Sequence, residues 1–443
     1  MSRVTRKKSI LSEPGPPLSP LPATAQPTPT SLLWVFPALL VVYLVLACTH
    51  MMLAPTGETG YQNAPDEAAH MAYVRSLALG HFPTMQQPLP ARLTAPSYEW
   101  HQPPLYYLFA MIFLPLGEKM VRLASVLCGT IALWMIYRTL RLAYPERPLL
   151  AITAAGVAAL IPTHVAITST VNNDVLLELF FSGTLLALLA SFHGGFTTRR
   201  AIWLGLGISG AILTKATGLL LLPISLFGLL LFWRAGESSK TLLRGAGIAI
   251  GTILALTGWW FVRNLMLYGE PLPLHGFAVA FAGTKQASEV ASRIGGWGAY
   301  LIQMAQGIFM SFWAVYGRPE DLKYGVPRFL PDSIYLLMGF VCIMALIGMI
   351  RIHFRRHLEF SQTQIYSIWL LFASVGLVAA SFFMFILKYF QMQGRYLYPA
   401  MLPISFILAL GWLSVFPPRY QALASALLLT LLGSCCILLL RSL

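Results

Sequence analysis

The stretch "LLWVFPALLVVYLVLACTHMML", residues 32–53, decides the class of fold, because it contains no Asp, Glu, Lys or Arg. About 20 apolar residues in a helix are enough to cross the hydrocarbon core of a bilayer. Within that core no water can satisfy the backbone groups, so a crossing segment has to be a helix or part of a closed barrel. This stretch therefore predicts a transmembrane helix.

The same pattern recurs along the chain, which is 57% hydrophobic and 10% charged and has a mean hydropathy of +0.69. A shorter run at 201–214 connects two longer ones, and its flanking Arg200 and Lys215 can extend it by reaching the membrane surface. We predict an all-α fold, a polytopic transmembrane bundle of about eleven spans (11–13), from apolar runs at about 32–53, 120–137, 149–167, 175–193, 201–214, 216–233, 242–262, 332–350, 364–387, 397–416 and 420–440.

The basic residues lie mainly in short loops between these runs, so the net charge of +14 orients a membrane protein and does not indicate nucleic-acid binding. The positive-inside rule then predicts a cytoplasmic N-terminus. If 103–117 were a span, the cluster around Arg138 would move outside. We therefore predict that 103–117 and 300–317 are interfacial helices of two long outer loops, 54–119 and 263–331.

The chain divides into a tail and one large domain. Residues 1–31 are rich in Pro, Ser and Thr and predict a disordered cytoplasmic tail. Residues 32–443 form the transmembrane domain with its two outer loops. The five cysteines all fall inside apolar runs without metal-ligand spacing, which is typical of core residues. Most of the sixteen acidic residues fall at the predicted outer face, so we expect function there.

The segment "NAPDEAAH", residues 63–70, places Asp66 and Glu67 directly after the first span. Two interpretations stay open. Pro65 at the first position of a helix followed by acids is a common helix start, stabilised by the helix dipole. The acid pair is equally consistent with an active site. His70 follows Asp66 by four residues, so both can face the same side of a helix. A metal site built from them is not predicted.

Six stretches resemble, in the same order, recurrent segments of the GT-C membrane glycosyltransferases, which include protein O-mannosyltransferases, lipid A aminoarabinose transferases and uncharacterised bacterial membrane proteins. "PDEAAHMAYVRSLALGHFP" (65–83) is similar to their first outer loop, and "HQPPLYYLF" (101–109) to the segment that closes it. "STVNNDVLLELF" (169–180) resembles their second acidic site. The later matches are "TKATGLLLLP" (214–223), "GWWFVRNLMLYGEPL" (258–272) and "QGRYLYPAMLP" (393–403).

This resemblance implies a polyprenyl-phosphate-linked sugar donor and transfer of a hexosyl or pentosyl group with inversion. Asp66 is then the general base for the acceptor hydroxyl, and Glu67 orients the acceptor or the helix. The leaving phosphate needs fixed positive charge. Four cations at the predicted outer boundary are candidates to hold it, and for each the alternative is a membrane-interface anchor: Arg395, Arg263, Lys215 and Arg75.

Asp174 and Glu178 are four residues apart and share one helix face, with Glu178 one turn deeper. An ionisable residue at that depth is a functional-site hypothesis by default. Three roles stay open for Asp174. It pairs with an outer cation, it contacts the acceptor, or it is the N-cap of a helix after Asn172 and Asn173. We predict an acceptor or sugar pocket that contains His70, His101, Asp174 and Glu178.

The predicted protein is a multi-pass plasma-membrane enzyme whose active site lies on the outer face. Its partners are the lipid-linked donor, membrane lipid and a glycolipid, polysaccharide or protein acceptor, and no nucleic acid. No cofactor is predicted, and a requirement for a divalent cation stays open. The alternative from another class is a transporter or flippase that uses Glu178 as a proton relay. It has less support, because the chain has no internal repeat. A non-catalytic membrane scaffold is a third possibility.

Overall fold

A computed structural model describes residues 30–55, 66–85, 99–316 and 328–443. The predicted disordered tail lies outside the described residues, except at its end. There the structure differs from the prediction, because the short helix α1 (Thr30–Leu33) begins at Thr30.

The N-terminal part of the chain contains the first spans and the first outer segment. Its elements are α2 (Val35–Leu53), α3 (Glu67–Ala78), α4 (Leu105–Met111), η2 (Leu114–Leu116), η3 (Glu118–Arg122), α5 (Leu123–Ala143), α6 (Pro148–Leu160), α7 (Pro162–Ile167), α8 (Asp174–Gly194), α9 (Thr198–Ile212), η4 (Ala216–Leu220), α10 (Leu221–Arg234) and α11 (Ser239–Tyr268).

The C-terminal part begins with the second outer segment. Its elements are α12 (Leu274–Phe281), α13 (Ala287–Arg293), α14 (Trp297–Trp313), β1 (Val315–Tyr316), β2 (Arg328–Phe329), α15 (Asp332–Glu359), α16 (Gln362–Ile386), η6 (Gly394–Ala400), α17 (Met401–Val415) and α18 (Pro418–Leu440).

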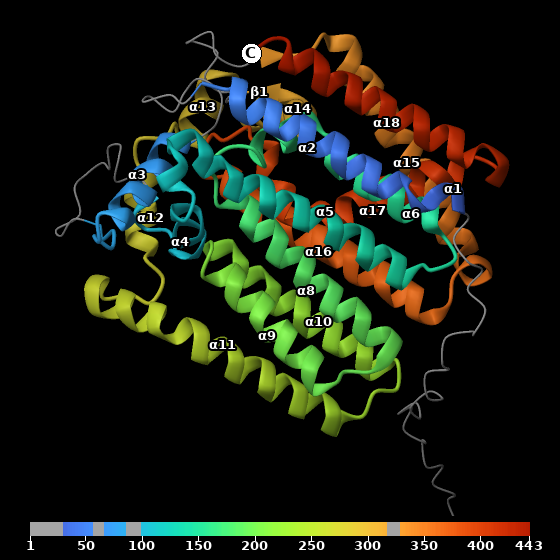
Figure 1. Ribbon diagram of the computed structural model, residues 1–443, viewed down its shortest axis with the longest axis horizontal. Coiled ribbons are helices and arrows are strands. Elements are labelled where there is room, and N and C mark those ends of the chain that lie inside the picture. The colour runs from blue at the N-terminus through green and yellow to red at the C-terminus, as the bar shows by residue number, and fades with distance from the viewer. Residues whose placement is uncertain (1–29, 56–65, 86–98, 317–327) are drawn as a thin grey trace, which may run out of the picture.

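The long helices run side by side as a bundle, with α11 along one edge and α18 along the opposite edge (Figure 1). The short helices α3, α4, α12 and α13 gather at one end of the bundle (Figure 1). The predicted all-α class is confirmed, although the antiparallel pair of two-residue strands β1 and β2 was not predicted.

Nine helices in the described ranges are long and apolar enough to cross a membrane. The two remaining predicted spans correspond to the shorter helices α6 and α9, with 13 and 15 residues. The count of eleven spans therefore stays a prediction. So does the position of α4 and α14 at the membrane interface. Helix α11 continues past residue 262 to Tyr268, and the second outer loop, 263–331, stays a prediction.

The predicted span 149–167 is not one helix, and this is a correction. It breaks after α6, where Ile161 takes an extended conformation (φ −71°, ψ 117°) and Pro162 starts α7. Proline has no N–H to continue the helical hydrogen bonds, and it disfavours the helical conformation in the residue before it. The break gives α7 a direction of its own, and α7 leads into the segment that carries Asp174.

Helices α15 and α17 pack with their backbones almost in contact. A β-carbon at Gly348 would lie 1.8 Å from the carbonyl oxygen of Gly411, and one at Gly411 would lie 2.1 Å from that of Ala345. Small residues that permit close backbone approach are typical of helix interfaces in membranes. This contact fixes α17, whose N-terminal extension is the η6 segment with Arg395.

Candidate active site

Asp66 is the N-cap residue of α3, which begins at Glu67, and Pro65 of the helix-start interpretation lies outside the described residues. Its backbone is left-handed (φ 66°, ψ 4°), the single non-glycine residue with positive φ in the described ranges. Its side chain makes no cap hydrogen bond to α3. It accepts instead from Nη2 of Arg395, at 2.8 Å. Backbone strain of this kind concentrates at functional sites.

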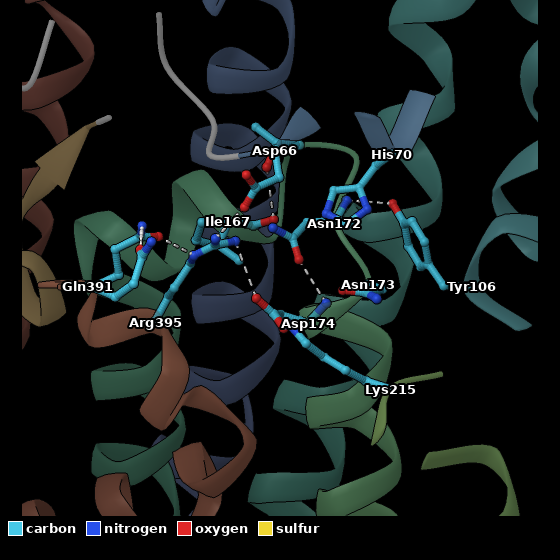
Figure 2. A network of polar contacts seen from close by, with 12 residues as sticks. Asp66, His70, Tyr106, Ile167, Asn172, Asn173, Asp174, Lys215, Gln391 and Arg395 are labelled. Carbon is cyan, nitrogen blue, oxygen red and sulfur yellow. Dashed lines mark hydrogen bonds and ion pairs between the residues drawn. The ribbon is translucent and has the colours of Figure 1, made fainter. Parts of the chain in front are cut away.

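Asp66, Arg395, Asp174 and Lys215 form one network of ion pairs, the four-residue network of this site (Figure 2). Nη1 of Arg395 donates to Oδ2 of Asp174 at 3.3 Å, and Nζ of Lys215 donates to Oδ1 of the same carboxylate. The arginine and Asp174 are almost fully buried, whereas the side chains of Asp66 and Lys215 are 15% and 18% exposed. Two acids and two cations therefore alternate at the end of the bundle where the short helices gather (Figure 1).

The guanidinium of Arg395 is oriented by two glutamines that the sequence analysis did not select. Its Nε donates to Oε1 of Gln393 at 2.8 Å, and Nε2 of Gln393 donates to Oε1 of Gln391 at 2.7 Å. Gly394 supplies the room for this arrangement, because a β-carbon there would lie 2.5 Å from the backbone N and Cα of Phe312. The fixed fork of Arg395 suits bidentate recognition of phosphate or carboxylate.

Glu67 binds Arg122 and makes none of the ion pairs of the four-residue network. Nε and Nη2 of Arg122 each donate to one oxygen of Glu67 at 2.7 Å. Oε1 of Glu67 also accepts from the backbone N–H of Val171, at 2.9 Å. Arg122 donates further to the carbonyl oxygens of Met51 and Ala54 at the end of α2. Glu67 therefore fixes the start of α3 against α2, η3 and the segment before α8, as its predicted helix-orienting role requires.

The segment before α8 holds Asp174 in place. Asn173 is the N-cap and Asp174 is the first residue of α8, so the capping alternative for Asp174 is wrong. The backbone N–H of Asp174 donates to Oδ1 of Asn172 at 2.8 Å, and the N–H of Asn172 donates to the hydroxyl of Tyr106 at 2.9 Å. Nδ2 of Asn172 and Oδ1 of Asn173 have no hydrogen-bond partner in the described part of the chain.

His70 and Glu99 are buried beside the network. Nδ1 of His70 and the hydroxyl of Tyr107 are 2.9 Å apart. Burial lowers the pKa of His70, which favours the neutral imidazole. Burial also raises the pKa of Glu99, against the opposing effect of His70, and Asp66 raises it further. Both side chains are close enough to Asp66 and Lys215 to interact with them electrostatically.

The other predicted site residues lie elsewhere. Arg75 pairs with Glu118 on the surface, where both side chains are about half exposed. Arg263 donates to the carbonyl oxygen of Pro83 and lies over the rings of Phe82 and Trp260. These contacts fix the end of the first outer segment to α11.

His101 and Glu178 occupy two different settings. Nε2 of His101 is 3.2 Å from Nε2 of Gln102, and its ring meets Phe277 of α12 edge-on. Glu178 lies one turn deeper than Asp174 and is 2.8 Å from Nε2 of His164. Within the described ranges, no three His, Cys, Asp or Glu side chains are grouped so that they could hold a metal ion.

Arg122 is the main functional candidate that sequence reasoning missed. It lies within the predicted run 120–137 and was treated as part of a span. An arginine at the predicted outer end of a span departs from the positive-inside rule, and this departure was the available signal.

Comparisons with known proteins agree with this architecture. Residues 101–260 match the family model of dolichyl-phosphate-mannose-protein mannosyltransferases. That match includes Asp174 and Lys215 and ends before Arg395. No curated protein matches the chain at the sequence level.

Two solved structures are similar over most of the chain. ArnT from Cupriavidus metallidurans, bound to undecaprenyl phosphate, is 16% identical with a TM-score of 0.52, and the match covers 90% of this chain and 64% of ArnT. The archaeal oligosaccharyltransferase AglB from Archaeoglobus fulgidus, in complex with an inhibitory peptide and a dolichol-phosphate, is 14% identical with a TM-score of 0.54. This match covers 94% of the chain and 56% of AglB.

The chain thus spans between about half and two-thirds of the length of these structures. At such low identity they establish the architecture, and the resemblance that the six sequence stretches implied is confirmed at that level. This polytopic helical chain has the fold of the GT-C membrane glycosyltransferases.

Proposed function

We propose that this protein is a glycosyltransferase that moves a sugar from a polyprenyl-phosphate-linked donor to an acceptor hydroxyl at the outer face of the membrane. The observation that carries the proposal is the four-residue network, which unites Asp66, Asp174, Lys215 and Arg395 from distant parts of the chain (Figure 2). These residues were nominated from separate motifs, and a transferase of this kind needs a carboxylate base beside phosphate-binding cations.

In the proposed reaction the acceptor oxygen attacks the anomeric carbon of the donor and forms a new C–O bond. The bond between that carbon and the phosphate oxygen breaks, and its electron pair stays on the phosphate. Asp66 takes the hydroxyl proton. Attack on the face opposite the leaving group inverts the anomeric carbon. The donor phosphodiester gains one negative charge as it becomes a phosphomonoester, and Arg395 and Lys215 stabilise that charge.

Asp174 serves this reaction by holding both cations. Each oxygen of its carboxylate binds one of them, so Arg395 and Lys215 are kept on the same side of the site. Two cations fixed in this way can receive a phosphate with little further ordering of their side chains, which is the advantage of a preorganised site. Asp66, which meets Arg395 through the other terminal nitrogen, competes with the phosphate for the guanidinium.

A donor-cleavage assay tests the proposal. Protein in lipid nanodiscs is incubated with a panel of polyprenyl-monophosphate sugars, and the release of free polyprenyl phosphate is followed. We expect release from at least one donor by the wild type and a loss of about 10²–10⁴-fold in Asp66→Asn, the range for removing a general base.

The matched control is Arg75→Gln, which removes a charge at the surface pair with Glu118 and should leave release unchanged. Equal release by wild type and Asp66→Asn would contradict the role of Asp66. Donors that cross the bilayer intact, with no release, would favour the transporter alternative.

A further inference from the structure

A polar pair that the proposed reaction does not use lies in the interior of the bundle. Nε2 of His164 in α7 and Oε2 of Glu178 in α8 are 2.8 Å apart, with side chains that are 0% and 1% exposed. The second polar atom of each, Nδ1 of His164 and Oε1 of Glu178, has no hydrogen-bond partner in the described ranges. Replacing such a pair by apolar residues is often neutral or stabilising, so the stability of the fold does not account for it.

The pair lies one helical turn deeper in the bundle than the four-residue network. Glu178 is one helical turn below Asp174 on α8. The ring of His164 meets the ring of Tyr398 edge-on, with centroids 5.2 Å apart, and Tyr398 belongs to the same η6 segment as Arg395. His164 therefore contacts both α8, which begins at Asp174, and η6, which carries Arg395.

Helix α7, which carries His164, is also fixed on its other sides. Thr163 exchanges two hydrogen bonds with Val315 of β1, at 2.8 and 3.1 Å. Ser169, just beyond the helix, lies 2.7 Å from Nδ1 of His50 in α2. The six residues of α7 are thus held at both ends, and they lead into the segment 168–174, in which the N–H of Val171 donates to Glu67.

We propose that His164 and Glu178 are positioning residues for the transferase site. Their pairing sets α7 against α8 and, through Tyr398, against η6, and so fixes the spacing of Asp174 and Arg395 to receive the lipid phosphate. This inference rests on the proposed function for its substrate. The pair itself touches neither donor nor acceptor and exchanges no proton with them.

The test removes the pair without leaving a buried charge. The double variant His164→Leu/Glu178→Leu is compared with Glu178→Gln, which keeps a hydrogen-bonding group, and with Ser182→Ala, a matched control one turn further along α8. We measure the melting temperature, the Kd for undecaprenyl phosphate and donor turnover. We expect the double variant to melt at or above the wild-type temperature while turnover falls about 10²-fold, the scale of a 1 Å misplacement.

The same variant should bind undecaprenyl phosphate at least tenfold more weakly, whereas Glu178→Gln and Ser182→Ala stay close to wild type. A folded double variant with wild-type turnover and binding would overturn the proposal. So would a series of variants in which turnover and binding fall only in proportion to the drop in melting temperature. If the double variant does not fold, Tyr398→Leu, which removes the ring contact from His164 to η6 and also a hydrogen bond to Phe312, is expected to weaken the same binding. Tyr398→Phe, which loses that hydrogen bond and keeps the ring, is its control. Unchanged binding by Tyr398→Leu would overturn the proposal.

Failure of the proposed function can be told apart from failure of this inference. If the wild type releases lipid phosphate from no donor, the transfer reaction is wrong. The positioning role is then judged by undecaprenyl phosphate binding and by amide hydrogen exchange of residues 168–174 and 394–400, which the double variant should accelerate. Wild-type exchange and wild-type binding in that variant would exclude the role.

Discussion

Asp66 combines a carboxylate at the centre of the site with a left-handed backbone, and different substitutions separate the two. Asparagine tolerates the left-handed conformation, whereas for alanine this conformation costs about 1–2 kcal/mol of free energy. Asp66→Asn therefore keeps the backbone and removes the charge that competes for Arg395.

We predict that Asp66→Asn binds undecaprenyl phosphate severalfold more tightly than wild type, because the phosphate no longer displaces a carboxylate from Arg395. Titration in nanodiscs measures the Kd of both proteins. Asp66→Ala should melt at a lower temperature than Asp66→Asn because of backbone strain. Weaker binding by Asp66→Asn would show that Asp66 supports the phosphate site and does not compete with it.

Glu99 gives a prediction about pH. Burial raises its pKa in the folded protein above the value in the unfolded chain. Below the unfolded pKa both states are protonated, so Glu99 costs no stability there. As pH rises through the folded pKa, the folded state has to ionise a buried carboxyl and loses stability. Glu99→Gln stays neutral throughout.

The melting temperature of Glu99→Gln relative to wild type should therefore rise as pH increases from below the ordinary carboxyl pKa towards neutrality. Thermal unfolding over that pH series measures the difference. A constant difference at every pH would mean that Glu99 ionises as readily in the folded protein as in the unfolded chain.

At the scale of elements, two arginine–glutamate pairs of the same chemistry differ in burial. Arg122 joins η3 to α3 and to the end of α2, with 1% of its side chain exposed. Arg75 joins α3 to η3 on the surface, with 51% exposed. Removing one partner from a buried pair leaves an uncompensated charge, and an exposed pair loses little because water replaces the partner.

Arg122→Gln should lower the free energy of unfolding by about 3–5 kcal/mol, and Arg75→Gln by about 0–1 kcal/mol. Thermal or denaturant unfolding in one detergent compares the two variants directly. Similar losses would mean that the Glu67–Arg122 contact does not hold α3 to the bundle.

At the scale of the whole molecule, the apolar runs were sufficient to predict the helices, because the spanning length and the need for internal hydrogen bonds leave few alternatives. The break at Pro162 could have been predicted too, since proline inside an apolar run interrupts a helix. The hairpin of β1 and β2 could not, because two residues in each strand give no periodicity.

The sequence nominated individual candidate residues, but it did not show which of them lie together in space. The motifs nominated Arg395 and Arg263 first, then Lys215 and last Arg75. Local sequence does not show which cation meets a carboxylate. The structure brings Arg395 and Lys215 to Asp174, and it sets Arg263 against aromatic rings. Neither glutamine was selected: Gln393 opens the quoted stretch 393–403 but received no role, and Gln391 lies outside every quoted stretch.

The predicted sides of the membrane can be checked by cysteine labelling. In a variant without its five native cysteines, Ser239→Cys at the start of α11 and Glu289→Cys in α13 are both exposed. The positive-inside rule predicts that a membrane-impermeant thiol reagent added outside intact cells labels Glu289→Cys and spares Ser239→Cys until the cells are opened. The opposite pattern would place the four-residue network on the cytoplasmic side.

The Asp66–Arg395 contact joins residues 329 positions apart in the chain. At translation rates of about 5–20 residues per second, on the order of half a minute separates the synthesis of the acid from that of its cation. A ribosome that stops before residue 395 leaves Asp66 without Arg395, although Glu67 can already bind Arg122. If the proposed function holds, sugar transfer requires nearly every span to be synthesised first, and incomplete chains are expected to release no lipid phosphate from the donor.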